Sequence, residues 1–258
     1  MSSLFRRIIG RYRRYMATRF FNNTIVIKTG KPLISFSFDD APRTSFTVGA
    51  ELLNQNGVKG TFFVSLGLLG CEAPGGTIAY SEDILRAARD GHELGCHTYD
   101  HLDAWGTAAS EFRASILRNR QGVRALLPDA EFRSFAYPIS DPSPMNKRCA
   151  GALFRSCRGG GQRANGGRID LNLLQAYFLD GRNRQDLRSI RSVIDRNAES
   201  GGWLIFATHD VTENPSGYGC TPEQLKTLID HSLKSGAEIL SIATGVERIR
   251  QAARGTGG

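Results

Sequence analysis

The sequence predicts an α/β fold, a distorted (β/α) barrel of seven or eight mostly parallel strands in one domain. Short apolar runs alternate with helical stretches along most of the 258 residues, which is typical of βα units around parallel strands. No internal repeat and no break in composition divides these units, so one barrel is favoured over two small domains. A doubly wound open sheet is the alternative, but the sequence lacks the glycine-rich phosphate-binding patterns that would favour it.

Eight apolar runs are the strand candidates, and helical stretches lie between them. The strands are expected at residues 32–38, 60–65, 93–96, 134–138, 153–157, 173–179, 203–208 and 237–242. The helices are expected at residues 44–56, 81–90, 110–127, 186–199 and 221–235. The last helix is the best marked, because Thr221 can cap its first turn, Pro222 suits its first position and Gly236 follows its end.

Three segments differ in character along the chain. Residues 1–30 form a basic N-terminal arm or amphipathic segment, residues 31–250 hold the barrel, and residues 251–258 are expected to be a flexible C-terminal tail. In the first segment apolar residues alternate with five arginines, Arg6, Arg7, Arg11, Arg13 and Arg14. This pattern is typical of a helix that lies on an anionic lipid surface, and a solvated basic arm is the alternative.

The charge of the chain narrows its partners and its location. A formal net charge of +8 and a pI near 9.5 suggest an acidic partner, namely nucleic acid, a membrane surface or an anionic glycan. Because much of this charge lies in residues 1–20, nucleic acid is disfavoured and peripheral membrane contact is favoured. There is no apolar signal region and no run long enough to span a bilayer, and the five cysteines are irregularly spaced. We therefore expect a cytoplasmic protein, in one interpretation peripheral at the inner membrane face.

Polar residues stand where three predicted strands end. Asp39 and Asp40 follow the strand at 32–38, His97 and His101 follow the strand at 93–96, and His209 follows the strand at 203–208. The carboxyl ends of parallel strands meet at one edge of a barrel, so these side chains are expected to converge. Two imidazoles at i and i+4 with a carboxylate can hold a divalent ion. Position 98 is Thr rather than Glu, which disfavours a metalloprotease of the H-E-x-x-H type.

The three motifs resemble those of the polysaccharide deacetylases of the NodB-homology group, also called carbohydrate esterase family four. That family has a TFDDGP-type motif, an H-[ST]-x-x-H motif and a late Leu-x-x-His-type motif, and residues 37–42, 97–101 and 204–210 stand here in the same order. The resemblance covers residues 33–242 and implies a distorted barrel. It also implies removal of N-acetyl groups from an N-acetylated amino-sugar oligomer or polymer, with release of acetate.

The resemblance also implies roles for single residues. Asp40, His97 and His101 would hold a divalent metal, with Zn²⁺ the usual ion. Asp39 would be the general base that takes a proton from the attacking water, and His209 would be the general acid that protonates the leaving amine.

The third family motif is divergent in this sequence. It usually reads Arg-Pro-Pro-[Tyr/Phe]-Gly, whereas residues 135–140 read Phe-Ala-Tyr-Pro-Ile-Ser. Ala136 stands in place of the arginine that steadies the base, and Arg133 is the expected substitute, ahead of Arg155 and Arg158. Ile139 falls where a backbone N–H would meet the oxyanion.

Other assignments are less directly marked. The fourth-motif aspartate that orients the acid histidine is not recognisable, and Asp180, after the strand at 173–179, is the candidate. Tyr137 and Leu204 belong to the motifs that the resemblance places near substrate. Trp105 follows the second motif and is a candidate for stacking on a sugar face, with simple packing as the alternative. Ala41 replaces the glycine of the first motif.

Three other functions remain open at this point. An esterase that removes O-acetyl groups from a glycan is chemically close and is not separated by the sequence. A non-catalytic glycan-binding protein is favoured by the altered third motif and disfavoured by the intact base, ligands and acid. An iron(II) oxygenase uses two histidines and one carboxylate, but it gives no role to Asp39 and His209.

Overall fold

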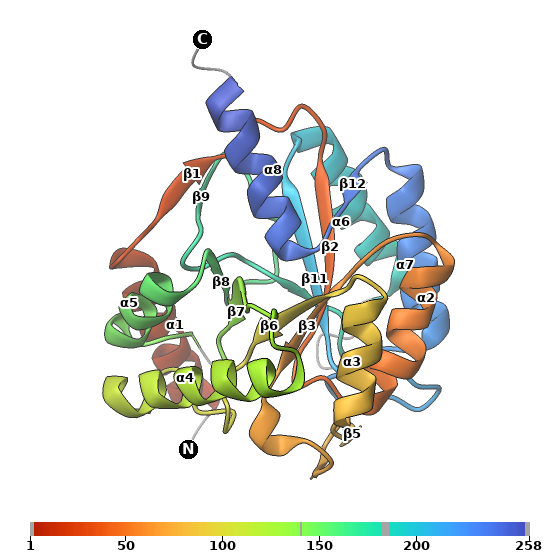
Figure 1. Ribbon diagram of the computed structural model, residues 1–258. Coiled ribbons are helices and arrows are strands. Elements are labelled where there is room, and N and C mark those ends of the chain that lie inside the picture. Colours follow the sequence, from red (N-terminus) through yellow and green to blue (C-terminus); the bar gives the residue numbers. More distant parts are fainter. Residues whose placement is uncertain (1–2, 140, 182–185, 256–258) are drawn as a thin grey trace.

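A curled sheet of parallel strands lies at the centre of the molecule with helices packed around it (Figure 1). The computed structural model describes residues 3–139, 141–181 and 186–255, with side chains from residue 8 onward. The sheet consists of β2 (Leu33–Phe38), β3 (Thr61–Val64), β6 (Glu93–Cys96), β7 (Ser134–Ala136), β8 (Ser156–Arg158), β10 (Tyr177–Phe178), β11 (Trp203–Thr208) and β12 (Glu238–Ile239). The distorted barrel of parallel strands predicted from the sequence is confirmed.

The order of the strands brings the three sequence motifs to neighbouring positions. The order is β10-β11-β2-β3-β6-β7-β8, and β12 pairs with the first two residues of β2. β2 and β11 pair along their whole length, from Leu33 opposite Trp203 to Phe38 opposite Thr208. Both strands are buried throughout because helices cover one face and the barrel interior covers the other.

The barrel is closed by an irregular segment between β8 and β10. Arg158 forms an isolated parallel bridge with Leu174, and the Gly159 N–H donates to the Leu174 carbonyl at 2.9 Å. Residues 173–179 were expected to be one strand, and only Tyr177–Phe178 is regular. The sheet is therefore distorted within the segment that was predicted to be a strand at residues 173–179.

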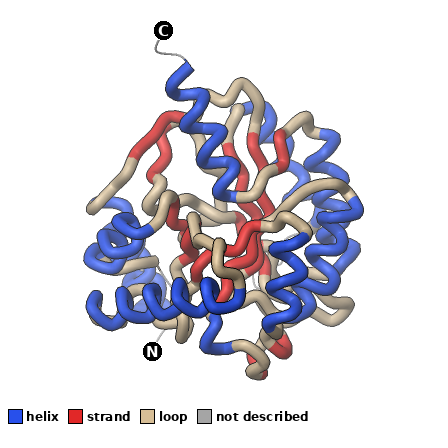
Figure 2. Tube along the Cα trace, in the orientation of Figure 1, coloured by secondary structure: helices blue, strands red, loops and turns tan. Residues whose placement is uncertain are grey.

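Helices and two short helical turns form the outer layer (Figure 2). They are α1 (Ser3–Arg19), a π-helical turn (Ser45–Gly49) leading into α2 (Ala50–Gln55), a 3₁₀ turn (Leu66–Leu68), α3 (Ser81–Arg89), α4 (Ala109–Leu126), α5 (Pro144–Leu153), α6 (Leu187–Ser200), α7 (Pro222–Lys234) and α8 (Ile242–Gly255). The five predicted helices are all present. Two short antiparallel pairs lie outside the barrel, β1 (Thr24–Val26) with β9 (Arg168–Asp170) and β4 (Glu72–Ala73) with β5 (Gly76–Thr77).

Two helices were not expected from the sequence, α5 and α8, and a third, α1, was expected only as one of two alternatives. α5 is capped by Ser143, whose hydroxyl accepts from the Asn146 N–H at 3.3 Å, with Pro144 at the first position. This is the same start signal that marked Thr221 and Pro222. α8 extends to Gly255, so the expectation of a flexible tail is wrong for residues 251–255, and residues 256–258 lie outside the described residues. α1 gives residues 3–19 a helical structure.

Side chains on alternate positions of β11 enter two different cores. Leu204 and Phe206 belong to the larger cluster between the sheet and the helices. Trp203, Ile205 and Ala207 belong to a second cluster, into which α8 packs. The alternation therefore fixes which face of β11 each side chain occupies. Among the described helices, none combines the length and the apolar character needed to cross a membrane.

Candidate active site

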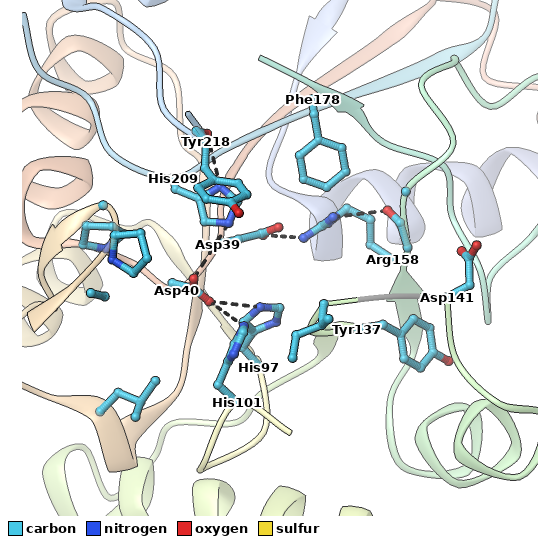
Figure 3. A pocket seen from close by; sticks show the side chains of 18 of the residues that line it. Asp39, Asp40, His97, His101, Tyr137, Asp141, Arg158, Phe178, His209 and Tyr218 are labelled. Atoms are coloured by element: carbon cyan, nitrogen blue, oxygen red, sulfur yellow. Dashed lines mark hydrogen bonds and ion pairs between the residues drawn. The ribbon is translucent and has the colours of Figure 1, made fainter. Parts of the chain in front are cut away.

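A cleft of about 940 Å³ lies at the carboxyl edge of the parallel strands. Asp39 and Asp40 directly follow β2, His97 directly follows β6 and His209 directly follows β11, and all four line this cleft together with His101. Figure 3 shows their side chains pointing toward one another. The parallel register of the sheet therefore brings together residues that are 170 positions apart in the sequence (39 to 209).

Three side chains in the cleft form a group with the spacing of a metal site. The ligand atoms of Asp40, His97 and His101 lie within 4.8 Å of one another. The Asp40 Oδ1 atom lies 2.9 Å from the His101 Nε2 atom and 3.4 Å from the His97 Nε2 atom. Two imidazole nitrogens and one carboxylate oxygen are a donor set that suits Zn²⁺ and leaves coordination positions for water and substrate.

The hydrogen bond of His97 favours the tautomer that a metal requires. Its Nδ1 atom lies 2.8 Å from the Ala136 carbonyl oxygen, which can only accept a hydrogen bond. Nδ1 therefore carries the proton, and in the neutral ring the lone pair of Nε2 points toward Asp40. A lone pair facing a carboxylate is repulsive unless a cation lies between them. The arrangement of these residues therefore fits a divalent ion.

The surroundings of Asp40 favour its ionised form, which is the form that binds a cation. Burial by itself would raise the pKa of its carboxyl group, but contact with His101 and His97 outweighs burial and holds that pKa well below its usual range. Burial lowers the pKa of His101, but contact with Asp40 outweighs it and raises this pKa. The carboxylate is thus kept ionised at the point where the two histidines converge.

Asp39 has a different partner from its neighbour. Its Oδ1 atom accepts a charge-assisted hydrogen bond from the Arg158 guanidinium, and both side chains are almost completely buried. The Arg158 guanidinium lies over the rings of Phe63 and Phe178, at 5.1 and 5.6 Å from their centroids. These contacts fix the arginine, and through it the Asp39 carboxylate, at the wall of the cleft.

His209 is oriented by a backbone carbonyl. Its Nδ1 atom lies 3.2 Å from the Tyr218 oxygen, and its Nε2 atom lies 3.8 Å from Asp40 Oδ2. The loop that carries Tyr218 is held by the buried Asp210, which accepts from the Ser216 N–H at 2.7 Å and from the Ser216 hydroxyl at 2.5 Å. The ring therefore presents Nε2 to the cleft, where it can hold a proton.

The expectation that Arg133 steadies Asp39 is wrong. Arg133 precedes the first residue of β7 and pairs with Glu247 of α8 at 3.1 Å, at the amino edge of the barrel. Arg155 precedes β8 and contacts the same glutamate. Arg158 is the last residue of β8, which places it at the carboxyl edge beside Asp39. Arg158 also follows the rule that had selected the aspartates and histidines, because it stands directly after the strand expected at residues 153–157.

Two other expectations are corrected by the structure. Leu204 is completely buried in the core between sheet and helices, so it has no surface to offer a substrate. The Trp105 ring packs against Tyr12 and Arg13 of α1, which agrees with the packing alternative. Among the described residues that line the cleft, neither Trp105 nor Asp180 is found, and the contact to His209 Nδ1 comes from Tyr218.

Tyr137 and Ile139 do line the cleft. The Tyr137 ring is buried and its hydroxyl donates to the Asn172 carbonyl at 3.0 Å, whereas the Ile139 side chain is 70% exposed. Ile139 has a φ of 66°, which is unusual for a β-branched residue. Residues with positive φ cluster at this site, and the ligand candidates Asp40 and His101 are among them. Ala41 has a φ of 51°, at the position where the family has glycine. Backbone strain is thus concentrated around the cleft.

The N-terminal helix also contributes to the cleft, which was not predicted from the sequence. Ile9, Gly10, Arg13 and Arg14 of α1 line it, as do residues of the β4–β5 hairpin. The alternating arginines were noticed, but no local pattern in the sequence shows which surface of the barrel a terminal helix covers.

Comparisons with known proteins agree with this geometry. A family model described as Polysaccharide deacetylase matches residues 27–151. A chitooligosaccharide deacetylase of Sinorhizobium fredii is 30% identical over 115 residues, which are 43% of this chain and 48% of that protein. The matches span between 17% and 48% of the length of the curated relatives.

Two solved structures show the same fold. The Xyl-CE4 domain of a multidomain xylanase from the hindgut metagenome of Trinervitermes trinervoides has a TM-score of 0.61 at 17% identity, covering 84% of this chain and 91% of that chain. A CE4 family pseudoenzyme from Bacillus anthracis has a TM-score of 0.56 at 15% identity, covering 86% of this chain and 67% of that chain. The family match over residues 27–151 and the fold shared with these structures support a polysaccharide deacetylase domain in this chain.

Proposed function

We propose that the protein is a metal-dependent hydrolase that removes N-acetyl groups from N-acetylated amino-sugar oligo- or polysaccharides and releases acetate. One observation carries the proposal. Asp40 and the two histidines that could hold a metal share one cleft with the arginine-paired carboxylate of Asp39 and with His209, whose Nε2 atom lies 3.8 Å from Asp40 Oδ2. Relatives named as chitooligosaccharide, chitin and peptidoglycan N-acetylglucosamine deacetylases support the same substrate class.

The metal, which we propose to be Zn²⁺, would be held by Asp40, His97 and His101. When bound there, a divalent ion supplies Lewis acidity, which activates water and polarises the acetyl carbonyl. The Ala136 carbonyl holds the His97 ring in the tautomer that can ligate.

Asp39 acts in the proposed reaction as the general base. Its carboxylate takes the proton of the attacking water, and the hydrogen bond from Arg158 keeps the carboxylate aimed at the cleft. Arg158 thus takes over the role of the arginine that Ala136 replaces.

His209 supplies the proton that completes the reaction. The Tyr218 carbonyl holds Nδ1–H, so Nε2 is the atom that gives its proton to the departing amine nitrogen. The backbone N–H of Ile139, at the rim of the cleft, is the proposed donor to the oxygen that becomes negative during the attack. Cleavage of the C–N bond then leaves acetate and the free amino sugar.

Acetate release tests the proposal. The zinc-loaded protein, the chelated protein and Asp39→Asn are compared on N-acetylglucosamine oligomers and on O-acetylated glycans. Release from the N-acetyl oligomers that is lost in both controls supports the hydrolase and the base. Release from the O-acetylated glycans alone would make the protein an ester hydrolase, and no release with metal bound would make it a glycan-binding protein.

We further propose that α1 contacts an anionic membrane surface. Ile8, Tyr12 and Tyr15 are more than half exposed, and their spacing places them on one face of the helix, with the exposed Arg19 at its end. Location at the inner membrane face agrees with the five free thiols of the chain. Sedimentation with phosphatidylglycerol but not phosphatidylcholine vesicles, reduced in the Tyr12→Ser/Tyr15→Ser variant, is the expected result. Equal sedimentation with both lipids would contradict it.

A further inference from the structure

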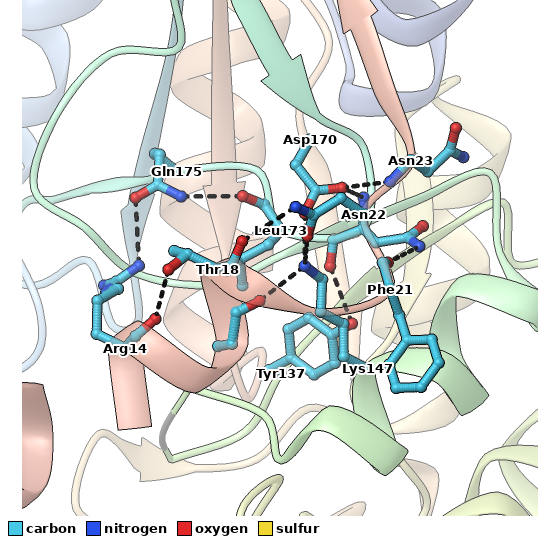
Figure 4. Close-up of polar contacts among 12 residues, drawn as sticks. Arg14, Thr18, Phe21, Asn22, Asn23, Tyr137, Lys147, Asp170, Leu173 and Gln175 are labelled. Atoms are coloured by element: carbon cyan, nitrogen blue, oxygen red, sulfur yellow. Dashed lines mark hydrogen bonds and ion pairs between the residues drawn. The ribbon is translucent and has the colours of Figure 1, made fainter. Parts of the chain in front are cut away.

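The inner face of α1 is a fixed wall of the cleft. Lys147 of α5 is completely buried, and its ammonium group contacts the Ala17 carbonyl at 2.7 Å, Asn22 Oδ1 at 2.5 Å and Asp170 Oδ2 at 2.6 Å. Figure 4 shows how this amine ties the end of α1 to the barrel. Asp170 also accepts from the backbone N–H of Asn23 at 2.8 Å. A helix anchored in this way presents the same side chains to the cleft at all times.

Arg14 and Arg13 are neighbours on that wall, but their guanidinium groups have different surroundings. Arg14 donates to the Gly160 carbonyl at 3.3 Å and to Gln175 Oε1 at 3.2 Å, and it pairs with Asp141 at 3.1 Å. Its donors are thus used in holding the helix to the barrel. Its charge is balanced by the adjacent carboxylate.

Arg13 is held by an aromatic ring. Its guanidinium lies 5.3 Å from the centroid of the Trp105 ring, and its Nε atom is buried without a hydrogen-bond partner among the described residues. The Trp105 ring is itself fixed by an edge contact with Tyr12, at 5.9 Å between centroids. A guanidinium supported from behind by a ring keeps its hydrogen-bond donors for a partner on the open side.

On the α1 side of the cleft, the positive charge of Arg13 has no carboxylate of its own among the described residues. Asp39 is paired with Arg158, Asp40 faces the histidines, and Asp141 is paired with Arg14. Arg13 also acts on Asp141, because its charge, together with that of Arg14, opposes the rise in the Asp141 pKa that burial causes. On the side of α1 one carboxylate therefore faces two arginines. The fourth carboxylate of the lining, Glu72, belongs to the β4–β5 hairpin and accepts from the Thr77 hydroxyl at 2.7 Å.

We propose that Arg13, backed by Trp105, forms a subsite for an anionic group, a phosphate or a carboxylate, carried by the amino-sugar substrate. The inference rests on the proposed function, because the subsite opens into the same cleft as Asp39 and the metal ligands. An arginine is suited to this task, since its planar donors match the paired oxygens of both groups.

Binding to a protein that does not turn over tests the subsite. The zinc-loaded Asp39→Asn protein is titrated with N-acetylglucosamine 1-phosphate, N-acetylmuramic acid and the neutral methyl N-acetylglucosaminide. We expect at least one anionic probe to bind about 10-fold more tightly than the neutral probe. The anionic probe that binds more tightly identifies phosphate or carboxylate as the group recognised.

Two charge-matched substitutions on the same helix locate the effect. Arg13→Gln is expected to weaken binding of the preferred anionic probe about 10-fold and to leave the neutral probe within about twofold. Arg11→Gln removes the same charge from an exposed position of α1 and is expected to change neither by more than about twofold. Equal affinity of the parent protein for all probes would overturn the subsite. The subsite would also be overturned if Arg13→Gln and Arg11→Gln lost equal affinity for the anionic probe, or if Arg13→Gln lost affinity for the neutral probe.

Because these measurements use binding, they separate the subsite from the activity. Acetate release from neutral and anionic substrates at equal rates, with no effect of Arg13→Gln on either, would remove the subsite and leave the hydrolase intact. Absence of acetate release from every substrate would remove the hydrolase, whereas the charge preference in the titration would still report on Arg13.

Discussion

The two sides of the cleft are built according to different rules. On one side Asp40, His97 and His101 stand at the spacing that the family motif prescribes. On the other side Arg158 comes from β8 and Arg13 from α1, at positions that the motif does not contain. Ligand atoms must lie within a few ångströms of a single ion, which fixes both residue type and spacing. A long, flexible arginine can reach the same carboxylate from several strands, so its place in the sequence is free to change.

The largest effect is expected on the metal side. His101→Ala removes one of three ligand candidates, so we expect zinc binding to weaken at least about 100-fold and acetate release to fall about 1000-fold. His231→Ala is the control, because this histidine pairs with Asp195 on the surface. Metal content and acetate release are measured on both. Full activity of the His101 variant with zinc retained would remove His101 from the site.

A smaller but still large effect is expected from Arg158. Arg158→Met leaves Asp39 buried without its cation, so we expect about 100-fold slower acetate release and a free energy of unfolding lower by about 3 to 5 kcal/mol. Arg133→Met changes the same residue type at the amino edge, where the side chain is 46% exposed. We expect this control to change release less than twofold and stability by less than about 0.5 kcal/mol.

Urea unfolding and acetate release distinguish the two arginines. If Arg133→Met slowed release as much as Arg158→Met, the assignment of Arg158 to the base would be contradicted. The divergent third motif would then have to act through the amino edge of the barrel, far from the cleft.

An intermediate effect is expected from the loop behind His209. Asp210→Ala removes the two hydrogen bonds to Ser216, so we expect about 10-fold slower kcat, little change in KM and about 2 kcal/mol lower stability. Asp210→Asn can still accept from the Ser216 N–H and donate to its hydroxyl, and we expect it to stay within about twofold. Steady-state kinetics check both variants. A large loss in the asparagine variant would show that the charge of Asp210, not its shape, supports His209.

The smallest effect is expected at Ile139. Ile139→Asn relieves the cost of a β-branched residue at φ 66° and keeps the backbone N–H, so we expect about 1 kcal/mol greater stability and activity within about twofold. Thermal melting and acetate release are the measurements. Because the side chain is exposed, little packing is lost. Strongly reduced activity would assign the Ile139 side chain, rather than its backbone, to substrate binding.

The strand-end rule explains which parts of the site were predictable. Asp39, Asp40, His97 and His209 follow strands whose apolar runs end sharply, and the structure brings all four together. Arg158 obeys the same rule, because it directly follows the strand expected at residues 153–157, but Arg133 was ranked above it because it lies three residues before Ala136. Nearness in sequence to the third motif thus favoured an arginine at the opposite edge of the barrel.

Other features depend on contacts that a sequence does not display. Ser143 and Pro144 carry a readable helix start between the strands expected at residues 134–138 and 153–157, where no helix was predicted. Leu204 belongs to the motif at residues 204–210, but side chains alternate between the two faces of β11, and Leu204 lies on the face that packs in the core. The docking of α1 depends on Lys147 and Asp170, which lie more than 120 residues away, so its place at the cleft follows from tertiary packing alone.

The contacts of the buried Lys147 amine also determine how far the N-terminus of this domain can be shortened without loss of stability. The family match begins at residue 27, and a fragment that starts there would lose both the Ala17 carbonyl and Asn22. The ammonium group would keep one carboxylate and lose two other acceptors in a site without solvent, at a cost of about 1 to 3 kcal/mol for each. The fragment would also open the cleft on the side of Arg13. The smallest independently stable unit is therefore longer at its N-terminus than the region that the family has in common.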